Sequence, residues 1–176
     1  YSFSKSLFPG LRIGSLTTRG RSIDGLVALK HATDLSDSMP LQAALAEFIG
    51  DGAYERHLGR IRRMLRKRHA AVAEALTEHL PQGATWTRPE GGYQVWVELP
   101  FAVDTRDLLA DASREGVLFS PGSQFQPGGG SSRCLRLTLA QADEQQIGHG
   151  LEVLGRLIRS RLESQTEAHS PAAQHL

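Results

Sequence analysis

The sequence predicts an α/β protein, because two kinds of hydrophobic spacing follow each other along the chain. Apolar residues recur at intervals of three, four or seven over residues 22–80, which is typical of helices. Between residues 82 and 139, apolar and polar residues alternate in short runs separated by turns, which is typical of strands. Residues 142–163 return to helical spacing. The chain is therefore expected to have a helical first part and a small sheet domain that a final helix closes.

The first 52 residues are predicted to form one strand and two helices. Residues 13–18 run from apolar residues to Thr after Gly14 and are expected to be a strand. Residues 22–32 and 40–49 carry apolar residues at helical spacing, and Pro40 opens the second of these helices. Asp51 and Gly52 end this second helix as a cap and a turn.

A helix over residues 53–80 is the longest predicted element, and Pro81 ends it. Its apolar stripe covers about seven turns and consists of Tyr54, Leu58, Ile61, Leu65, Val72, Leu76 and Leu80. Against one acid, Glu55, its first half carries seven basic residues: Arg56, Arg60, Arg62, Arg63, Arg66, Lys67 and Arg68. We interpret them as the solvated face of an amphipathic helix rather than a surface for nucleic acid or anionic membrane. No aromatic residues alternate with them, as a base-stacking surface requires.

From residue 82 onward the sequence predicts a second, smaller domain. Its expected strands are residues 85–87, 93–99, 117–120 and 135–139, with a turn at residues 89–92. A helix over residues 105–115 begins at Asp104 or Thr105 and is closed by Gly116. Residues 121–132 are predicted to be a loop, because no Lys-Ser/Thr follows their three consecutive glycines as in a phosphate-binding loop.

Composition narrows the class of protein. The net charge of +1 gives no global electrostatic case for a nucleic-acid partner. Cys134 is the only cysteine, which excludes an internal disulfide and fits a reducing compartment. No apolar run approaches the roughly 20 residues that cross a bilayer, and no signal peptide is recognisable. We therefore expect a cytoplasmic protein without a membrane partner, and the spacing of the histidines predicts no metal site.

The stretch from Ser2 to Gly14 carries most of the functional information. It places Lys5 among serines and Arg12 seven residues later, with Pro9 and Gly10 forming a turn between them. A lysine with a lowered pKa can attack an aldehyde as a nucleophilic amine, and an arginine offers a planar fork for two phosphate oxygens. An aldehyde cofactor that carries a phosphate needs both groups.

This stretch resembles the lysine segment of fold-type I enzymes that depend on pyridoxal phosphate, the aspartate aminotransferase superfamily. The family pattern is Ser/Thr-x-Ser-Lys, a few residues, then Pro-Gly-x-Arg-x-Gly, and this sequence departs from it at Tyr1, where relatives usually have Gly. The resemblance implies that Lys5 binds the cofactor aldehyde as a Schiff base and that Ser2, Ser4 and Arg12 hold the phosphate. The Ser-x-x-Lys motif of penicillin-binding hydrolases also fits Ser2 and Lys5, but its companion motifs are missing.

Arg136 is the second candidate site residue. Successive side chains of a strand point to opposite faces of the sheet. In the strand 135–139, the three leucines are therefore expected to face a core and Arg136 the opposite side. A partly buried guanidinium needs an anionic partner, so something acidic is expected to meet it. The resembled family has an arginine in this strand that clamps the α-carboxylate of the substrate, and Arg136 matches its position. A salt bridge at a sheet edge is the alternative.

The resemblance also implies an architecture. Residues 1–52 would be the C-terminal remnant of a large cofactor-binding domain, residues 53–81 a long interdomain helix, and residues 82–164 a small α+β domain with an antiparallel sheet. Residues 165–176 are expected to be a flexible tail. We expect the chain to be the C-terminal part of a longer protein, because relatives bind the cofactor ring with residues upstream of the lysine.

Two function classes fit this sequence. Residues 41–49 and 55–64 look most like the aminotransferase-like domain of MocR-type regulators in the GntR family, although Ser15 stands where relatives usually have an aromatic residue. Such proteins sense an amino acid or amine through pyridoxal phosphate, and bind DNA through a domain absent from this chain. The alternative is a free-standing class I/II aminotransferase. In both cases the resemblance implies a homodimer in the full-length protein.

Overall fold

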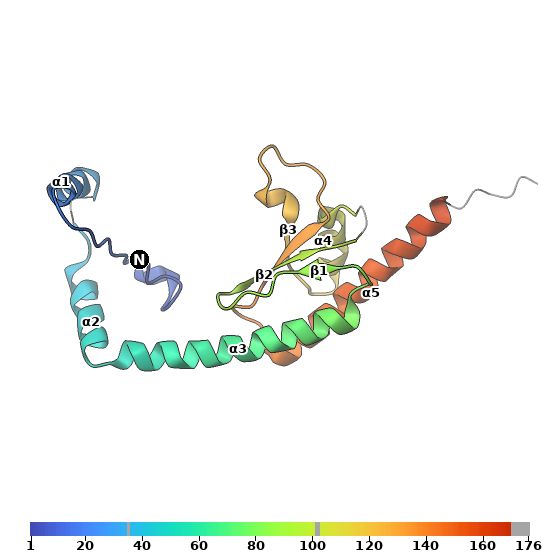
Figure 1. Ribbon diagram of the computed structural model, residues 1–176, viewed down its shortest axis with the longest axis horizontal. Coiled ribbons are helices and arrows are strands. Elements are labelled where there is room, and N and C mark those ends of the chain that lie inside the picture. The colour runs from blue at the N-terminus through green and yellow to red at the C-terminus, as the bar shows by residue number, and fades with distance from the viewer. Residues whose placement is uncertain (35, 101–102, 170–176) are drawn as a thin grey trace, which may run out of the picture. The chain divides into compact units, whose positions relative to one another are not determined.

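The computed structural model describes residues 1–34, 36–100 and 103–169, with side chains described as far as residue 164 (Figure 1). The chain forms two compact units, Tyr1–Arg63 and a second that begins at Met64. The boundary falls within α3 (Ala53–His79), which is one continuous helix in the structure. Pro81 follows two residues after its end, as the sequence predicts.

The first unit contains the short 3₁₀ helix η1 (Pro9–Leu11), α1 (Ser22–Asp34), α2 (Met39–Gly50) and the start of α3. Its buried cluster is Phe3, Leu11, Leu45 and Tyr54, which Leu7, Ile13, Phe48 and Leu58 extend. Asp51 caps α2, and Gly52 takes the left-handed conformation at φ 68°, as predicted. In contrast, α1 buries none of its residues within the described chain.

The strand predicted over residues 13–18 is wrong. Gly14 forms only an isolated antiparallel bridge with Ser2, supported by bonds from Phe3 N to Ile13 O at 3.2 Å and from Ser15 N to Tyr1 O at 2.8 Å. A strand needs a neighbour along its whole length. Leu16, just beyond the bridge, is 73% exposed, so the apolar run continues without a partner in the described residues.

The second unit is built on a four-stranded antiparallel sheet. In space its strands follow the order β1 (Thr85–Trp86), β2 (Gln94–Glu98), β4 (Cys134–Thr138) and β3 (Ser120–Pro121). The number of strands agrees with the prediction, although β1 and β3 have only two residues each. The strand predicted over residues 117–120 is misplaced, because β3 begins only at Ser120 and includes Pro121, which is predicted to lie in the following loop. Pro121 ends β3 at the edge of the sheet, where a residue without an N–H is tolerated.

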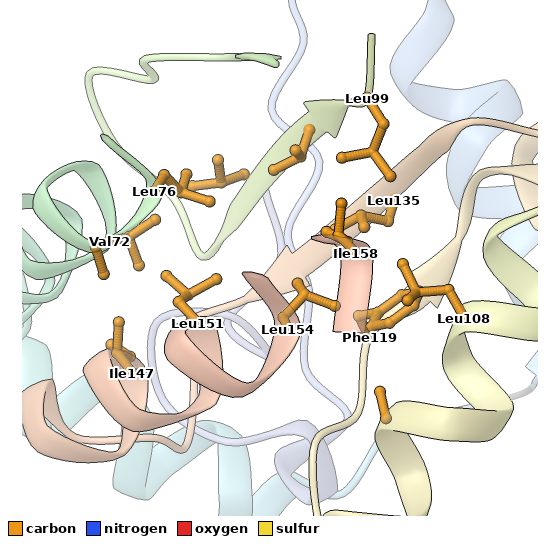
Figure 2. Close-up of a cluster of buried hydrophobic side chains, with 14 of the residues drawn as sticks. Val72, Leu76, Leu99, Leu108, Phe119, Leu135, Ile147, Leu151, Leu154 and Ile158 are labelled. Atoms are coloured by element: carbon orange, nitrogen blue, oxygen red, sulfur yellow. The ribbon is translucent and has the colours of Figure 1, made fainter. Parts of the chain in front are cut away.

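One face of this sheet forms the core of the second unit (Figure 2). Val95, Val97 and Leu99 alternate into the core, and Leu135 faces it from β4. The predicted helical stripes meet them: Val72 and Leu76 from α3, Leu108 and Ala112 from α4 (Thr105–Arg114), and Ile147, Leu151, Leu154 and Ile158 from α5 (Glu144–His169). The opposite face of the sheet, the polar face, carries Arg136 from β4 beside Trp96 from β2.

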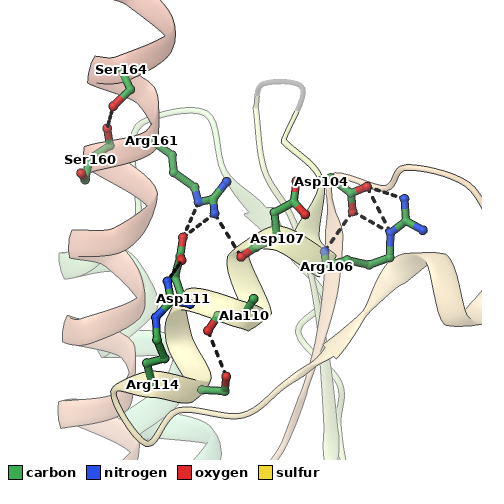
Figure 3. A network of polar contacts seen from close by, with 10 residues as sticks. Asp104, Arg106, Asp107, Ala110, Asp111, Arg114, Ser160, Arg161 and Ser164 are labelled. Carbon is green, nitrogen blue, oxygen red and sulfur yellow. Dashed lines mark hydrogen bonds and ion pairs between the residues drawn. The ribbon is translucent and has the colours of Figure 1, made fainter.

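Polar contacts join α4 to its cap and to α5 (Figure 3). Asp104 is the N-cap of α4, and its carboxylate accepts from Arg106 N at 2.9 Å. Arg161 on α5 donates from Nε to Asp111 at 2.9 Å and from Nη2 to the carbonyl of Asp107 at 3.0 Å. Arg114 also pairs with Asp111. Arg161 therefore ties α5 to α4 at two points.

The C-terminal helix is longer than predicted. It continues to His169, beyond the expected end at residue 163, so residues 165–169 of the predicted tail are helical. Residues 170–176 of that tail lie outside the described residues.

The basic residues of α3 divide into two groups. Arg56, Arg60, Arg62, Arg63, Arg66 and Lys67 are exposed, as a solvated face requires. Arg68 is an exception, because it is half-buried and its Nη1 donates to the carbonyls of Leu139 and Ala140 at 2.7 and 2.9 Å. Its interpretation as a solvated charge is wrong, since it ties α3 to the chain that follows β4.

Candidate functional site

The segment around Lys5 is a turn that its apolar residues hold in place. Phe3 and Leu11 are buried and Leu7 is half-buried, whereas Lys5 itself is exposed. The amide of Leu7 donates to the carbonyl of Phe3 at 2.8 Å and closes the turn around Lys5. An exposed lysine therefore extends from a backbone that apolar side chains anchor.

The other three residues predicted for this site lie along the same stretch. Ser4 N donates to Ser2 Oγ at 3.4 Å, and the bridge to Gly14 brings Ser2 near the chain that follows Arg12. Arg12 adopts the left-handed conformation at φ 51° and ψ 33°, where non-glycine residues are uncommon and often functional. Its Nη1 donates to Pro9 O at 3.4 Å, and it forms no ion pair with a carboxylate of the described chain.

Arg136 lies on the polar face of the second unit's sheet. It is the cross-strand partner of Trp96 on β2 and of Ser120 on β3. Its Nη2 donates to Ser120 Oγ at 3.2 Å, and its guanidinium lies over the ring of Phe125, 4.4 Å from the centroid. Trp96 meets the edge of the same ring at 5.5 Å between centroids. A hydroxyl and two aromatic rings therefore surround Arg136.

The acidic partner expected for Arg136 is not found among the described residues. Its Nε is buried and has no hydrogen-bond partner there, and none of the ion pairs in that part of the chain involves it. A buried donor without a partner costs free energy. The described chain thus leaves one donor of Arg136 unused, as it does Nε of Arg68 and Nε1 of Trp86.

Sequence reasoning missed two residues near Lys5. Tyr54 and His57, at the start of α3, both bind Ser6: the Tyr54 hydroxyl donates to Ser6 Oγ at 2.9 Å, and His57 Nε2 lies 2.8 Å from Ser6 O. Burial raises the pKa of the Tyr54 phenol. In the sequence Tyr54 reads as a member of the apolar stripe, and nothing in the spacing pairs α3 with residue 6.

Trp96 and Phe125 were also not assigned to the site from the sequence. Phe125 lies in the stretch 121–132, which the sequence predicts to be a loop, and Trp96 shares the polar face of β2 only by alternation. Lys5 belongs to the first compact unit and Arg136 to the second.

The described residues contain neither a membrane-spanning helix nor a cluster of metal ligands. Within 1–34, 36–100 and 103–169, no helix combines the length and hydrophobicity needed to cross a bilayer. The same ranges contain no group of three or more His, Cys, Asp or Glu arranged for a metal ion.

Comparison with known proteins identifies the family. The family model described as "Aminotransferase class I and II" matches residues 1–154. The chain is 37% identical over 161 residues to a 2-aminoadipate transaminase of Thermus thermophilus, covering 92% of this chain and 40% of that protein. It is 34% identical to an uncharacterised HTH-type transcriptional regulator of Escherichia coli, covering 92% of this chain and 34% of the regulator.

Solved structures agree with this result. An α-aminoadipate aminotransferase of Thermus thermophilus, in complex with N-(5'-phosphopyridoxyl)-L-leucine, superposes with a TM-score of 0.82 at 36% identity, covering 93% of this chain and 42% of that one. A multiple substrate aminotransferase of Thermococcus profundus superposes with a TM-score of 0.85 at 31% identity, covering 93% of this chain and 40% of that one.

The chain spans about two fifths or less of the relatives it matches. The fold that the chain shares with these structures is that of the fold-type I transferases, which confirms the predicted fold class. The chain therefore belongs to the class I and II aminotransferase family, whose cofactor is pyridoxal phosphate.

Proposed function

We propose that this chain is part of a domain that binds pyridoxal phosphate, with Lys5 as the amine that bonds to the cofactor. The observation that carries the proposal is the turn around Lys5, in which buried Phe3 and Leu11 anchor an exposed lysine. The residues beside it fit the cofactor: Ser2 and Ser4 offer hydroxyls, and Arg12 has a guanidinium without a carboxylate partner in the described chain. A phosphate dianion is the natural partner of such a donor set.

When bound, pyridoxal phosphate supplies an aldehyde for amines and a ring that accepts electrons from bonds at Cα. The role of Lys5 Nζ is to bond to the cofactor and, once displaced by a substrate amine, to carry a proton to or from the substrate Cα. Ser2, Ser4 and Arg12 hold the phosphate through charge-assisted hydrogen bonds and so keep the cofactor in register with Lys5.

Arg136 is proposed to bind the carboxylate of the amino acid. Its guanidinium rests on Phe125 and has an unpartnered Nε, so a carboxylate would satisfy a donor that the described chain leaves unused. Two parallel N–H···O bonds would fix the orientation of the amino acid as well as its affinity. The alternative of a salt bridge at a sheet edge has no support among the described contacts of Arg136.

For the full-length protein we propose a MocR-type regulator of the GntR family, in which this domain senses an amino acid or amine. Similar proteins include five HTH-type transcriptional regulators at 28 to 34% identity. DNA binding then belongs to a domain outside this chain, and a cytoplasmic location and a homodimer are parts of the same proposal.

A free-standing aminotransferase acting on an α-amino acid is the second candidate. One observation favours it, because the 2-aminoadipate transaminase at 37% and an aromatic-amino-acid aminotransferase of Thermococcus litoralis at 32% are as similar as the regulators. The residues named above serve both functions, since both begin with the capture of an amino group.

The two candidates differ in what happens after capture. The full-length protein is mixed with pyridoxal phosphate, a panel of amino acids and a keto acid, and the amino-acid products are measured over time. A regulator gives a lasting spectral change with little product, whereas rapid turnover would contradict the regulator and establish the enzyme. Lys5→Ala is the control, because it removes the bond to the cofactor in either case.

A further inference from the structure

Two side chains of α3 hold the residue next to Lys5. Tyr54 reaches Ser6 through its hydroxyl at 2.9 Å, and His57 reaches the backbone carbonyl of the same residue through Nε2 at 2.8 Å. Forty-eight or more positions in sequence separate these partners. Ser6 is thus hydrogen-bonded through both its side chain and its main chain, and it is the residue next to the proposed reactive lysine.

The hydroxyl groups around Tyr54 form an ordered chain. Tyr54 gives its hydrogen to Ser6 Oγ, so the Tyr1 hydroxyl, at 2.5 Å from the Tyr54 hydroxyl, must donate to it. Ser6 Oγ in turn donates to the carbonyl of Phe3 at 3.4 Å. This chain therefore connects α3 to both sides of Lys5, at residues 3 and 6.

The contact from His57 has a defined direction. A carbonyl oxygen can only accept, so Nε2 of His57 must carry the hydrogen. The ring also meets Phe48 edge to face at 6.4 Å, and Phe48 meets Tyr54 in the same way at 6.4 Å. Both donors are therefore oriented by the same aromatic neighbour and aimed at one residue.

Apolar packing alone does not explain why residue 54 carries a hydroxyl group. Tyr54 is 7% exposed and contacts Phe3 at 5.8 Å between ring centroids, which a phenylalanine would do equally well. The hydroxyl of Tyr54 adds only its bonds to Ser6 and Tyr1. These bonds restrain the turn, whose own closing bond is from Leu7 N to Phe3 O.

We propose that Tyr54 and His57 are positioning residues for Lys5, which act through Ser6 and present the amine at a fixed place. The inference rests on the proposed role of Lys5 as the amine that bonds to pyridoxal phosphate. Neither side chain touches the cofactor in this account. Their effect is to limit the orientations of the backbone from which the lysine side chain extends, which raises its effective concentration at the aldehyde.

Reductive labelling tests this role in the chain as it stands. The protein is incubated with pyridoxal phosphate, the C=N bond formed with loss of water is reduced by borohydride to a stable secondary amine, and labelled peptides are quantified by mass spectrometry. The chain has three lysines, Lys5, Lys30 and Lys67, so the ratio of label at Lys5 to label at exposed Lys67 is an internal measure.

We expect the wild-type chain to label Lys5 in preference to Lys67. Tyr54→Phe and His57→Leu each lower this ratio about three- to tenfold, the factor that corresponds to the loss of one hydrogen bond. His57→Gln restores it, because its amide can donate to Ser6 O. Adding Ser6→Ala to Tyr54→Phe lowers the ratio by less than the two single effects multiplied, since both remove the bond between Tyr54 and Ser6 and only the long bond from Ser6 Oγ to Phe3 O is lost in addition.

Leu45→Ala is the matched control, because Leu45 is buried in the same cluster without a bond to Ser6. It is expected to lower the melting temperature without changing the ratio. An equal fall of the ratio in Leu45→Ala would overturn the inference in favour of general loosening. Unchanged ratios in Tyr54→Phe and His57→Leu would overturn it as well.

A failure of the proposed function gives a result different from a failure of the positioning role. If Lys5 in the wild-type chain is labelled no more than Lys67, the role of Lys5 itself is wrong. Hydrogen exchange at the Leu7 amide, measured without cofactor, then still tests the restraint. Faster exchange in Tyr54→Phe and His57→Leu supports it, and unchanged exchange overturns it.

Discussion

Gly155 in α5 lies directly against the backbone carbonyl of His79 at the C-terminal end of α3. A Cβ built on Gly155 would clash with the carbonyl oxygen and lie 2.9 Å from its carbon. Arg159, one turn further along α5, donates from Nη1 to the same carbonyl at 2.6 Å. The backbones of α3 and α5 therefore approach closely at this point, and a side chain of α5 caps the end of α3.

Gly155→Ala is expected to destabilise the protein by about 1–3 kcal/mol, the usual cost of overpacking a close contact. The control is Gly148→Ala. It should stabilise the protein by about 1 kcal/mol, because alanine has a higher helix propensity than glycine. Gly148 is in the same helix, and a Cβ there meets nothing within 4 Å. Urea unfolding of both variants measures the difference, and equal stability of the two would contradict the close contact.

Arg136→Met is expected to change the free energy of unfolding by no more than about 1 kcal/mol. The substitution loses one bond to Ser120 and the contact of the guanidinium with the Phe125 ring, but it also removes the buried Nε that has no partner. Arg161→Met is the comparison, because Arg161 binds both Asp111 and the carbonyl of Asp107. It should cost more, and a larger loss of stability for Arg136→Met would show that Arg136 is structural.

The same Arg136→Met substitution is expected to weaken amino-acid binding by the full-length protein. A charge-assisted hydrogen bond contributes roughly 1.5–3 kcal/mol, so the affinity should fall about 10- to 100-fold. Titration of the cofactor spectrum with amino acid measures this. Binding of an amine without a carboxylate is the control, and it should be unaffected.

Asp111 is expected to make the free energy of unfolding fall as the pH is lowered into the acid range. Hydrogen bonds from Arg161, with further lowering from the charges of Arg161 and Arg114, hold the pKa of this carboxyl below its usual range. The ionised form is therefore favoured in the folded state. Its contribution is present above the unfolded pKa of about 4 and is lost as pH falls through the lower folded value.

Asp111→Asn should accordingly be less stable than the wild type at pH 7, by up to about 1 kcal/mol for an ion pair open to solvent. The difference should shrink as the pH falls below about 4. Urea unfolding over a pH series measures it. Glu90→Gln, in an exposed turn, is the control, and a gap that stays constant with pH would contradict the assignment.

The chain by itself is expected to bind pyridoxal phosphate only weakly. It spans about two fifths of the aminotransferases it resembles, and the residues proposed to hold the cofactor contact only its aldehyde and its phosphate. Absorption spectroscopy of the chain with added cofactor measures this. A stable visible band that disappears in Lys5→Ala would contradict the expectation.

Much of the secondary structure could be predicted from spacing, because helix formation and alternation are local properties. The apolar stripe of α3, the cap at Asp104 and the inward face of α5 followed from residues a few positions apart. Local spacing could not predict whether residues 13–18 form a strand. Its formation depended on a neighbour along its length, which the described chain supplies only at Ser2.

The sequence by itself predicted the α/β class, because hydrophobic spacing is a local property. The resemblance of residues 2–14 and of the strand 135–139 to a known family implied the cofactor and the candidates Lys5, Ser2, Ser4, Arg12 and Arg136. Only the tertiary structure decided what surrounds them. Tyr54 and His57 bind Ser6 from about 50 positions away, and Arg136 meets Ser120 and the ring of Phe125 instead of a carboxylate. Such contacts arise when separate elements bury their apolar faces together, and the spacing within one element carries no information about them.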